Sequence, residues 1–383
     1  MGAGPLAGTL VLDLTRVLAG PYCTMVLSDL GARVIKIEPP GTGDDSRHIG
    51  PFMKGKSAYF MSINRGKESI ALDLKAPADR AVFERLLSVG DVLVENYRGG
   101  TMEKLGYGWE ALHPRFPRLV YAAASGFGHS GPYRTRAAYD MVVQGMGGIM
   151  SLTGHPGSPP TRVGTSVGDI TAGLFTAIGI NAALFERERT GLGRKVDVAM
   201  LDCQVAILEN AIARYFSTGQ VPGPLGARHP SITPFEAFRT GDDHPAVAAG
   251  NDGLFRRLAD ALGRPDLAAN PLFASNELRT RHAAALKAEI EQALAAHGTA
   301  HWLAAIDAAG VPCGPINDVA QALADPQVRA RNMVVSVDDP DVGELRMAGN
   351  PVKLSGVDDP ATRRPAPALD ADRARILAEL GLA

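Results

Sequence analysis

Short apolar runs rich in β-branched residues alternate with stretches of helical periodicity over the first 125 residues. The runs predict buried strands at residues 9–14, 33–38, 70–74, 92–95 and 119–124. Between them, apolar residues at helical spacing predict helices over residues 21–30 and 76–89. Because strands that alternate with helices form βαβ units, we expect an α/β fold with a mostly parallel sheet.

The pattern changes near residue 218, after two long helices expected at about 169–188 and 201–217. Residues 218–230 contain three prolines and three glycines, which indicates a linker or crossover. Beyond it, we expect short strands and helices at residues 235–238, 246–249, 252–263, 277–296 and 300–309. Strand character returns at 333–337 and 344–347, before a final amphipathic helix at 370–380. The predicted division is a large domain over 1–199, a helix and linker over 200–225, a small α+β domain over 226–325, and a return to the large domain over 326–383.

Composition and charge exclude several classes of protein. A chain of 383 residues with 45% hydrophobic content can bury a sizeable core without disulfide or metal support. It contains 39 Lys and Arg residues and 41 Asp and Glu residues. This near-balance argues against a general nucleic-acid or anionic-membrane surface, so we expect neither partner.

The cysteines and the first residues of the chain indicate a cytoplasmic protein. Cys23, Cys203 and Cys313 lie far apart in apolar surroundings, so we expect buried thiols and no bound metal. Residues 1–14 lack the basic start and long apolar core of a signal peptide. We also expect no membrane span, because the longest apolar stretches carry charges.

Three short motif matches have surroundings that do not fit the motif. Residues 50–57 match the phosphate loop GxxxxGK[ST], but no buried strand precedes them and no suitable helix follows. Residues 126–131 match GxGxxG, but no acidic residue follows at the required distance. Residues 164–168 match the nucleophile elbow GxSxG, but the paired prolines upstream cannot form a central strand. A serine hydrolase remains a less favoured alternative.

Gly168 and Asp169 stand at the predicted start of a long helix. One interpretation is structural, since Asp is a strong N-cap residue. The other is chemical, because a carboxylate beside a glycine can attack an acyl carbon while nearby backbone N–H groups stabilise the oxyanion. The two interpretations are compatible.

The chain resembles the class III CoA-transferases, also called the CaiB–BaiF family, in eight segments that occur in order at family-like spacing. They include SGFGHSGPY (125–133), VGDITAG (167–173) and GVPCGPINDV (310–319), together with residues 12–44, 57–75, 91–106, 138–145 and 229–238. The resemblance implies a Rossmann-like large domain built from both chain ends, a smaller α+β domain and an interlocked homodimer. It also implies that CoA is a substrate and that no cofactor is needed.

The resemblance implies that Asp169 is the nucleophile. Its carboxylate would form a mixed anhydride with the donor acyl group and then an enzyme-bound CoA thioester. The residues that match CoA-contact positions are Val17, Leu18, Leu72, Lys75, Asn96, Tyr97, Arg98, Lys104 and Arg136. Those that match the acyl site are Tyr139, Asp140, Gly250 and Asn251. The loop at 248–253 is expected either to close over Asp169 or to supply an N-cap, from Asn251 or Asp252, to the next helix.

Two departures from the family pattern bear on the substrate. Formyl-CoA transferases tend to carry glutamine where Leu18 stands and a run of glycines near residues 248–250. The resemblance therefore favours succinyl-CoA as donor and a small carboxylic or dicarboxylic acid as acceptor, rather than formate or oxalate. An α-methylacyl-CoA racemase of the same family is an alternative, but its catalytic His stands at the position of Tyr139, which is a poor base. A non-catalytic CoA-binding protein is a further alternative.

Overall fold

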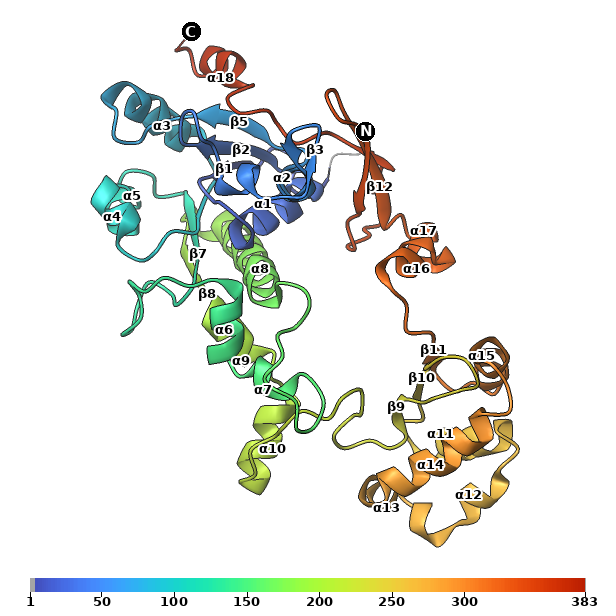
Figure 1. Ribbon diagram of the computed structural model, residues 1–383. Coiled ribbons are helices and arrows are strands. Elements are labelled where there is room, and N and C mark those ends of the chain that lie inside the picture. The colour runs from blue at the N-terminus through green and yellow to red at the C-terminus, as the bar shows by residue number, and fades with distance from the viewer. Residues whose placement is uncertain (1–3, 383) are drawn as a thin grey trace. The chain divides into compact units, whose positions relative to one another are not determined.

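The computed structural model describes residues 4–382, and the chain divides into two units (Figure 1). Unit 1 takes the chain up to Ser151, Arg162–Pro222 and the chain from Pro326 onward. Unit 2 takes Leu152–Thr161 and Gly223–Asp325. Segments from both ends of the chain therefore build unit 1.

A parallel six-stranded sheet in the order β5-β2-β1-β6-β7-β8 forms the centre of unit 1. Its strands are β1 (Leu10–Asp13), β2 (Arg33–Glu38), β5 (Glu68–Ala71), β6 (Val92–Glu95), β7 (Val120–Ser125) and β8 (Lys195–Ala199). Counted in chain order, these strands lie as 3-2-1-4-5-6, which is the order of a doubly wound Rossmann-like fold. The predicted α/β class is confirmed. Strand β5 begins two residues before the predicted run, and β8 was not predicted.

The strand order reverses between β1 and β6. In such sheets the crevice beyond the carboxyl ends of these two strands is the usual ligand site, because the chain leaves them toward opposite faces. The segments that begin at Leu14 and at Asn96 directly follow these two strands. The topology therefore predicts a ligand site at these two loops.

Helices cover both faces of the sheet. Helices α1 (Ala19–Asp29) and α8 (Val167–Thr190) pack on the face that contains Val11 and Val92. Helix α3 (Pro77–Val89) packs on the opposite face, which contains Leu12 and Leu93. Because both faces are buried, the central strands β1, β6 and β7 are largely apolar.

By length and composition alone, helix α8 is long and apolar enough to cross a membrane, contrary to the expectation that charges interrupt every long apolar stretch. In unit 1 its buried residues face α1 and the sheet, and they include Ala177, Ile180 and Leu184. The helices are close together at Gly173, where an added Cβ would lie 2.7 Å from the carbonyl oxygen of Ala19. This packing accounts for the apolar side of α8.

The remaining helices of the central part of unit 1 are short. They are η1 (Asp45–His48), α2 (Ala58–Asn64), α4 (Thr101–Leu105), α5 (Trp109–Leu112), α6 (Asp140–Met146), α7 (Ile149–Leu152), α9 (Met200–Ala206) and α10 (Asn210–Thr218). A single helix over 201–217 was expected. The chain instead breaks at Glu209, whose φ of 46° is incompatible with a continuous right-handed helix.

The C-terminal segment returns to unit 1 and completes it. Its elements are α17 (Pro326–Ala330), β12 (Val334–Asp339), β13 (Gly343–Ala348), β14 (Thr362–Arg363) and α18 (Arg373–Glu379). Two backbone N–H groups of the edge strand β5 donate to side chains of this segment. Ser69 donates to Asp372 Oδ2 at 2.9 Å, and Ala71 donates to Asp370 Oδ1 at 2.7 Å.

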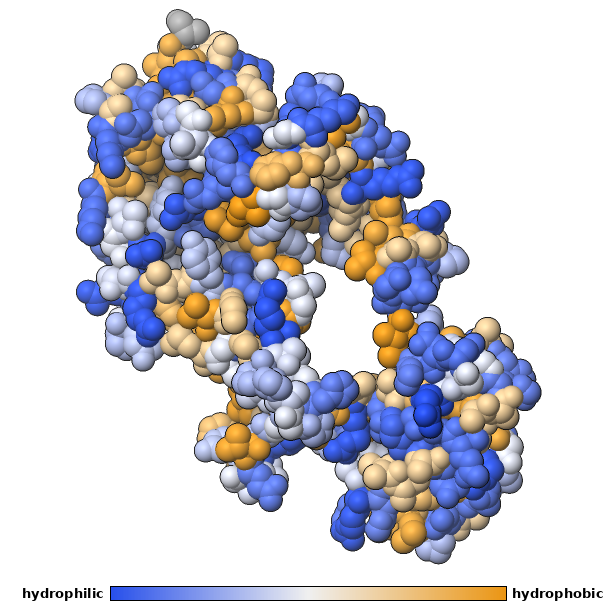
Figure 2. All heavy atoms as spheres, in the orientation of Figure 1, coloured by the Kyte–Doolittle hydropathy of each residue, from blue (hydrophilic) through white to orange (hydrophobic). Residues whose placement is uncertain are grey.

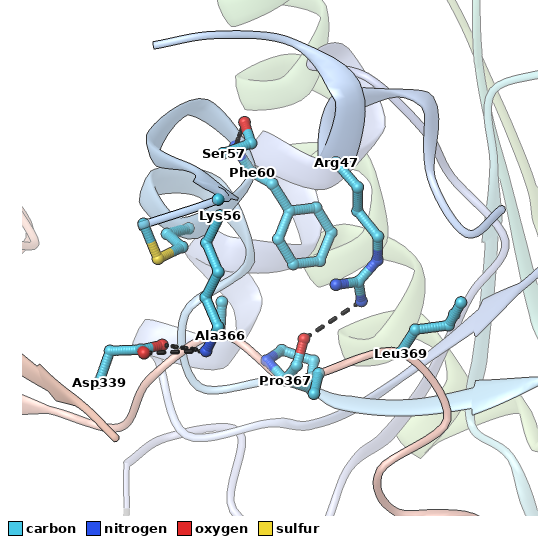
Figure 3. Close-up of a pocket in the computed structure, with 11 residues that line it drawn as sticks. Arg47, Lys56, Ser57, Phe60, Asp339, Ala366, Pro367 and Leu369 are labelled. Carbon is cyan, nitrogen blue, oxygen red and sulfur yellow. Dashed lines mark hydrogen bonds and ion pairs between the residues drawn. The ribbon is translucent and has the colours of Figure 1, made fainter. Parts of the chain in front are cut away.

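Residues 50–57, which match the phosphate-loop pattern, contain a small hairpin of β3 (Phe52–Met53) and β4 (Lys56–Ser57). Lys56 Nζ lies 2.8 Å from Asp339 Oδ1, and Arg47 donates to the carbonyl of Pro367 at 3.2 Å (Figure 3). The lysine of the motif therefore forms an ion pair with the C-terminal segment.

Unit 2 has its own core, formed around a three-stranded antiparallel sheet. Its strands are β9 (Phe235–Ala237), β10 (Ala246–Ala248) and β11 (Cys313–Gly314). Its helices are α11 (Asp252–Ala261), α12 (Pro265–Ala269), η2 (Pro271–Phe273), α13 (Asn276–Arg281), α14 (Ala283–Leu294), α15 (Thr299–Ala308) and α16 (Val319–Ala324). The helix expected over 277–296 is divided at His282.

The loop at 248–253 belongs to unit 2, and Asn251 is the N-cap of α11. Its Oδ1 accepts the backbone N–H of Leu254 at 2.9 Å. Asp252 pairs with the buried Arg279 at 2.7 Å. Neither Gly250 nor Gly253 has a positive φ, so neither adopts the backbone conformations that only glycine permits. The proposed closure of this loop over Asp169 stays a prediction.

Replacing Asn251 by alanine is expected to lower the free energy of unfolding by about 1 kcal/mol, because the N–H of Leu254 loses its partner. Urea unfolding measures this loss, and Asn251→Ser is the matched control because serine also caps helices. If the loop acts only as a cap, both variants retain the wild-type ranking of acceptor acids. A changed ranking in Asn251→Ala with unchanged stability would contradict the cap.

Candidate active site

Asp169 lies in the first turn of α8 and lines a pocket of about 130 Å³ at the reversal point of the sheet. The N-cap of α8 is Ser166, so the alternative in which Asp169 caps the helix is wrong. Its carboxylate instead accepts a hydrogen bond from the backbone N–H of Ala19. The predicted site residues that line this pocket with Asp169 are Val17, Leu18, Asn96, Tyr97, Arg98, Arg136 and Tyr139.

Asp140 joins α6 to the start of α8. Its Oδ1 accepts the backbone N–H of Gly168 at 2.8 Å, and its Oδ2 accepts from Gln144 at 2.8 Å and from Arg162 at 3.2 Å. Gly168 is required here, because an added Cβ would lie 2.7 Å from Val143 Cγ2. Tyr139 is the N-cap residue of α6, and its side chain is 74% exposed. Asp140 therefore fixes the turn that carries Asp169, while Tyr139 faces solvent.

Burial raises the pKa of Asp169 to about 7, and the negative charge of Asp140 adds to this rise. The hydrogen bond from Ala19 acts in the opposite direction, because it favours the charged form. Burial also raises the pKa of Tyr59 to about 12, with contributions from the charges of Asp169, Asp44 and Asp140. The site thus contains an acid that changes its charge near neutral pH.

The value of kcat/KM is expected to fall about tenfold per pH unit below pH 7, because only ionised Asp169 can act as a nucleophile. Asp140→Asn removes the neighbouring negative charge and keeps an acceptor for Gly168, so it is expected to move this acid limb to lower pH. The pH dependence of kcat/KM, which reports on the free enzyme, measures both the slope of the acid limb and its shift. Asp202→Asn is the matched control, because Asp202 is an exposed carboxylate of α9 that does not line the pocket. If Asp140→Asn leaves the acid limb at the wild-type pH, the assignment of this limb to Asp169 is wrong.

The loop between β1 and α1 forms one wall of the pocket and contains a strained residue. Val17 has a φ of 65°, in the left-handed region that β-branched residues avoid. Such a conformation costs on the order of 1–3 kcal/mol and persists only where the surroundings enforce it. Asn96, which follows β6, accepts the N–H of Arg16 at 2.9 Å and donates to its carbonyl at 2.7 Å. The two loops of the crevice are therefore bound to each other.

Four arginines line the pocket: Arg16, Arg98, Arg134 and Arg136. Arg16 pairs with Asp45 at 3.2 Å, and both side chains are exposed. The guanidinium of Arg136 lies over the ring of Tyr133, 4.5 Å from its centroid. Arginine recognises carboxylate and phosphate groups through paired hydrogen bonds, so the pocket is suited to anionic ligands.

A second pocket of about 610 Å³ shares Tyr97 with the first. Its apolar lining includes Leu14, Ile37, Leu72 and Leu105, and two lysines also line it, Lys75 and Lys104. An apolar slot with nearby ammonium groups is suited to a planar base that carries phosphate. All of the predicted CoA-contact residues therefore line one or the other of these two adjoining pockets.

Several residues at this site were missed by the sequence analysis. They are Tyr59, Asp44, Arg134 and Arg162, and they come from four separate segments. Of these, Asp44 lies within the segment 12–44 that carries the resemblance, but its neighbours GTGDD indicate only a turn. Gly250 and Asn251 lie in unit 2 and do not line the pocket.

The three thiols contribute little to this site. Cys23 and Cys203 are buried, as expected, whereas Cys313 is only half-buried. Burial raises the pKa of Cys203 to about 11, so it is a weak nucleophile. Within residues 4–382, His, Cys, Asp and Glu side chains form no group of three that could hold a metal ion.

Comparisons with known proteins agree with this geometry. Residues 6–373 match CoA-transferase family III. The acetyl-CoA:oxalate CoA-transferase of Acetobacter aceti is 49% identical over 377 residues, 98% of this chain and 96% of that protein. The succinate–glutarate CoA-transferase of Agrobacterium fabrum is 40% identical over 389 residues, 98% of this chain and 96% of that protein. The crystal structure of a CaiB/BaiF family protein from Brucella suis has a TM-score of 0.85 at 40% identity, over 99% of this chain and all of that chain. The chain belongs to CoA-transferase family III, the CaiB/BaiF family.

Proposed function

We propose that this class III CoA-transferase uses Asp169 as its nucleophile, with succinyl-CoA as donor and a short dicarboxylic acid as acceptor. The observation that carries the proposal is the position of Asp169. It stands at the start of α8, in the pocket at the sheet reversal, beside the segments 16–19 and 96–98. The membership of the family supports CoA transfer between an acyl-CoA and a carboxylic or dicarboxylic acid.

The proposed reaction proceeds through two kinds of covalent intermediate. The Asp169 carboxylate attacks the thioester carbonyl, forms a mixed anhydride and releases CoA as a thiolate. The thiolate attacks the aspartyl carbonyl, so the donor acid leaves and CoA becomes bound as an aspartyl thioester. The acceptor carboxylate then repeats these steps in reverse. Each step exchanges one activated acyl bond for another, so no ATP is required.

The arginines of the pocket support a dicarboxylic substrate. After one carboxyl group becomes the thioester or the anhydride, the second remains charged and needs a cation. Arg16, Arg98, Arg134 and Arg136 can supply it. The succinate–glutarate relative supports succinyl-CoA as donor. The acetyl-CoA:oxalate relative does not support the expectation that oxalate is excluded, so that pair is the second candidate.

A donor and acceptor screen tests this proposal. Succinyl-CoA and acetyl-CoA are each incubated with oxalate, glutarate, mesaconate and formate, and the new acyl-CoA is identified by mass spectrometry. We expect the highest kcat/KM with succinyl-CoA and a dicarboxylic acid. Transfer from acetyl-CoA to oxalate at a higher kcat/KM would reject the succinyl donor, and preference for formate would reject the dicarboxylic class.

A racemase activity is tested with the same enzyme. In D2O, without an acceptor acid, a 2-methylacyl-CoA is expected to retain its α-hydrogen. Tyr139 is exposed and no imidazole stands at its position, so the site lacks the His that the racemase mechanism uses. Deuterium at the α-carbon would favour the racemase instead.

We propose in addition that a second copy of the chain covers α10. This helix buries none of its residues within the chain, and Tyr215 and Phe216 on it are exposed. Apolar surface is visible over α10 in Figure 2. Light scattering after size exclusion measures the mass, and Phe216→Asp, which places a charge in this surface, is expected to yield monomer. A wild-type monomer would reject the dimer.

A further inference from the structure

Three consecutive residues of the loop between β1 and α1 are held by side chains from three different segments. The carbonyl of Thr15 accepts from Lys36 Nζ at 2.7 Å. Asn96 binds the N–H and the carbonyl of Arg16. The N–H of Val17 donates to Asp44 Oδ1 at 3.0 Å. The backbone of the loop is therefore held at three consecutive residues.

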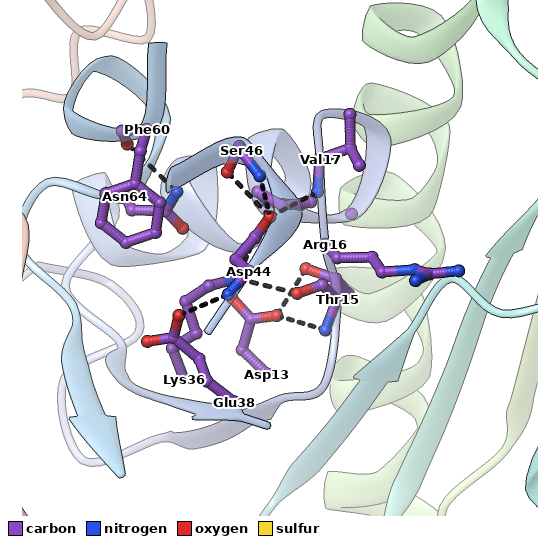
Figure 4. Close-up of polar contacts among 12 residues, drawn as sticks. Asp13, Thr15, Arg16, Val17, Lys36, Glu38, Asp44, Ser46, Phe60 and Asn64 are labelled. Carbon is purple, nitrogen blue, oxygen red and sulfur yellow. Dashed lines mark hydrogen bonds and ion pairs between the residues drawn. The ribbon is translucent and has the colours of Figure 1, made fainter. Parts of the chain in front are cut away.

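The carboxylate of Asp44 is itself held in place (Figure 4). Its side chain is 1% exposed, and Oδ2 lies 2.8 Å from Nζ of the fully buried Lys36. Its Oδ1 also accepts from the backbone N–H and the hydroxyl of Ser46, both at 2.8 Å. Its own N–H donates to Glu38 Oε2 at 2.9 Å. Asp44 is thus a preorganised acceptor for Val17.

The residue that Asp44 holds is the strained one. Val17 has a φ of 65°, and a valine leaves this conformation readily unless its surroundings enforce it. Two residues further on, the N–H of Ala19 donates to the carboxylate of Asp169. A change of the backbone at Val17 therefore moves the donor that faces Asp169.

We propose that Asp44 is a positioning residue of the transfer reaction, which holds Val17 in its left-handed conformation and so sets the segment 17–19 against Asp169. The proposal rests on the proposed role of Asp169. Asp44 acts through the backbone and touches neither substrate nor the reacting atoms. Lys36 supports this role of Asp44, because its ammonium group binds both the Asp44 carboxylate and the carbonyl of Thr15.

Asp44→Ala is expected to lower kcat roughly 100-fold, because small displacements of a reacting group cost about this much. The KM for acyl-CoA changes less, since Asp44 lines neither pocket. Loss of the Ala19 hydrogen bond makes ionisation of Asp169 less favourable, so the acid limb of the pH–rate profile moves to higher pH. Asp44→Asn keeps an acceptor for Val17 and is expected to restore part of kcat.

A second substitution separates positioning from stability. Glycine adopts positive φ without strain, so Val17→Gly placed on Asp44→Ala is expected to recover kcat at least fivefold. It does not restore the partner of Lys36, so the lowered midpoint of urea unfolding remains. Asp29→Ala is the matched control, because it removes the partner of the buried Arg65 at the other end of α1. It is expected to lower the unfolding midpoint and leave kcat within twofold of wild type.

The outcomes are distinguishable. A wild-type kcat and an unmoved acid limb in Asp44→Ala, beside an inactive Asp169→Ala, would overturn the role of Asp44 alone. Activity retained in Asp169→Ala would reject the nucleophile, and the role of Asp44 with it. If Asp44→Ala does not fold, Val17→Pro decides the question, because proline fixes φ near −65° and leaves the pair of Asp44 and Lys36 in place. A kcat and an acid limb equal to wild type in this variant would again overturn the proposal. If Asp29→Ala loses as much kcat as Asp44→Ala, lowered stability alone explains the loss of activity in Asp44→Ala.

Discussion

An Asp169→Ala variant is expected to lose CoA transfer by roughly 10⁴-fold or more in kcat, as enzymes do when a covalent nucleophile is removed. Acyl-CoA is expected to bind with a Kd within a few-fold of wild type, because the other residues of the two pockets remain. Hydroxylamine added to wild type during turnover is expected to modify Asp169 only in the presence of acyl-CoA. Mass spectrometry of the peptide that contains this residue measures the modification, and turnover retained by the variant would reject the assignment.

Removing the charge of Asp169 is expected to raise the stability of the folded protein. The pKa of Asp169 is raised from 3.8 to about 7 by folding, so the folded chain binds more protons and stability falls as pH rises from about 4 to about 7. Above pH 7 the full cost of the buried charge is present. Asp169→Asn is therefore expected to raise Tm more at pH 8 than at pH 5. Equal changes at both pH values would show that the carboxyl is not destabilised by burial.

The largest expected effect on stability comes from Lys67. Its ammonium and the Asp13 carboxylate are both fully buried at 3.0 Å, and Lys67 also donates to Asn64 and to the carbonyl of Pro21. Lys67→Met leaves the Asp13 charge without this partner, which is expected to lower the free energy of unfolding by about 3–5 kcal/mol. Urea unfolding measures the loss.

Two further variants show whether the loss comes from the unpaired charge. Arg264→Met removes a half-buried surface cation from Asp266 and Glu289, and we expect a loss of about 1 kcal/mol or less. Adding Asp13→Asn to Lys67→Met removes the remaining charge, so it is expected to recover part of the stability. A double variant less stable than Lys67→Met would show that Asp13 matters through its hydrogen bonds to Thr15 and Thr24 rather than through its charge.

The sequence was sufficient for the parts of the fold that depend on local pattern. The runs 33–38 and 92–95 coincide with β2 and β6, because the apolar residues that dominate the middle of each run are buried in the parallel sheet. Strand β8 was missed because its sequence, KVDVA, is short and contains two charges. The predicted helices over 201–217 and 277–296 were each too long, because Glu209 and His282 leave the helical region without a glycine or proline to indicate it.

The candidate site was predictable only where a family motif marks it. Asp169 and the residues that follow β1 and β6 were identified in this way, and the fold places them in one pocket. Asp44 and Tyr59 lie in segments that carry the resemblance, but nothing in those segments marks them as site residues, and Arg162 lies in none of the segments. Each of the three acts on a partner more than 20 residues away in the chain. Contacts between distant segments depend on the packing of the whole unit, which a local pattern does not contain.

The hydrogen bonds from β5 to the C-terminal segment have a consequence for biosynthesis. An uncovered edge strand is a template for pairing with another chain and hence for aggregation. On β5, Ser69 and Ala71 direct donors outward, and the side chains of Asp372 and Asp370 occupy them. Because about 300 residues separate these partners, the sheet emerges from the ribosome with this edge open, and it stays open until Asp370 and Asp372 have been made.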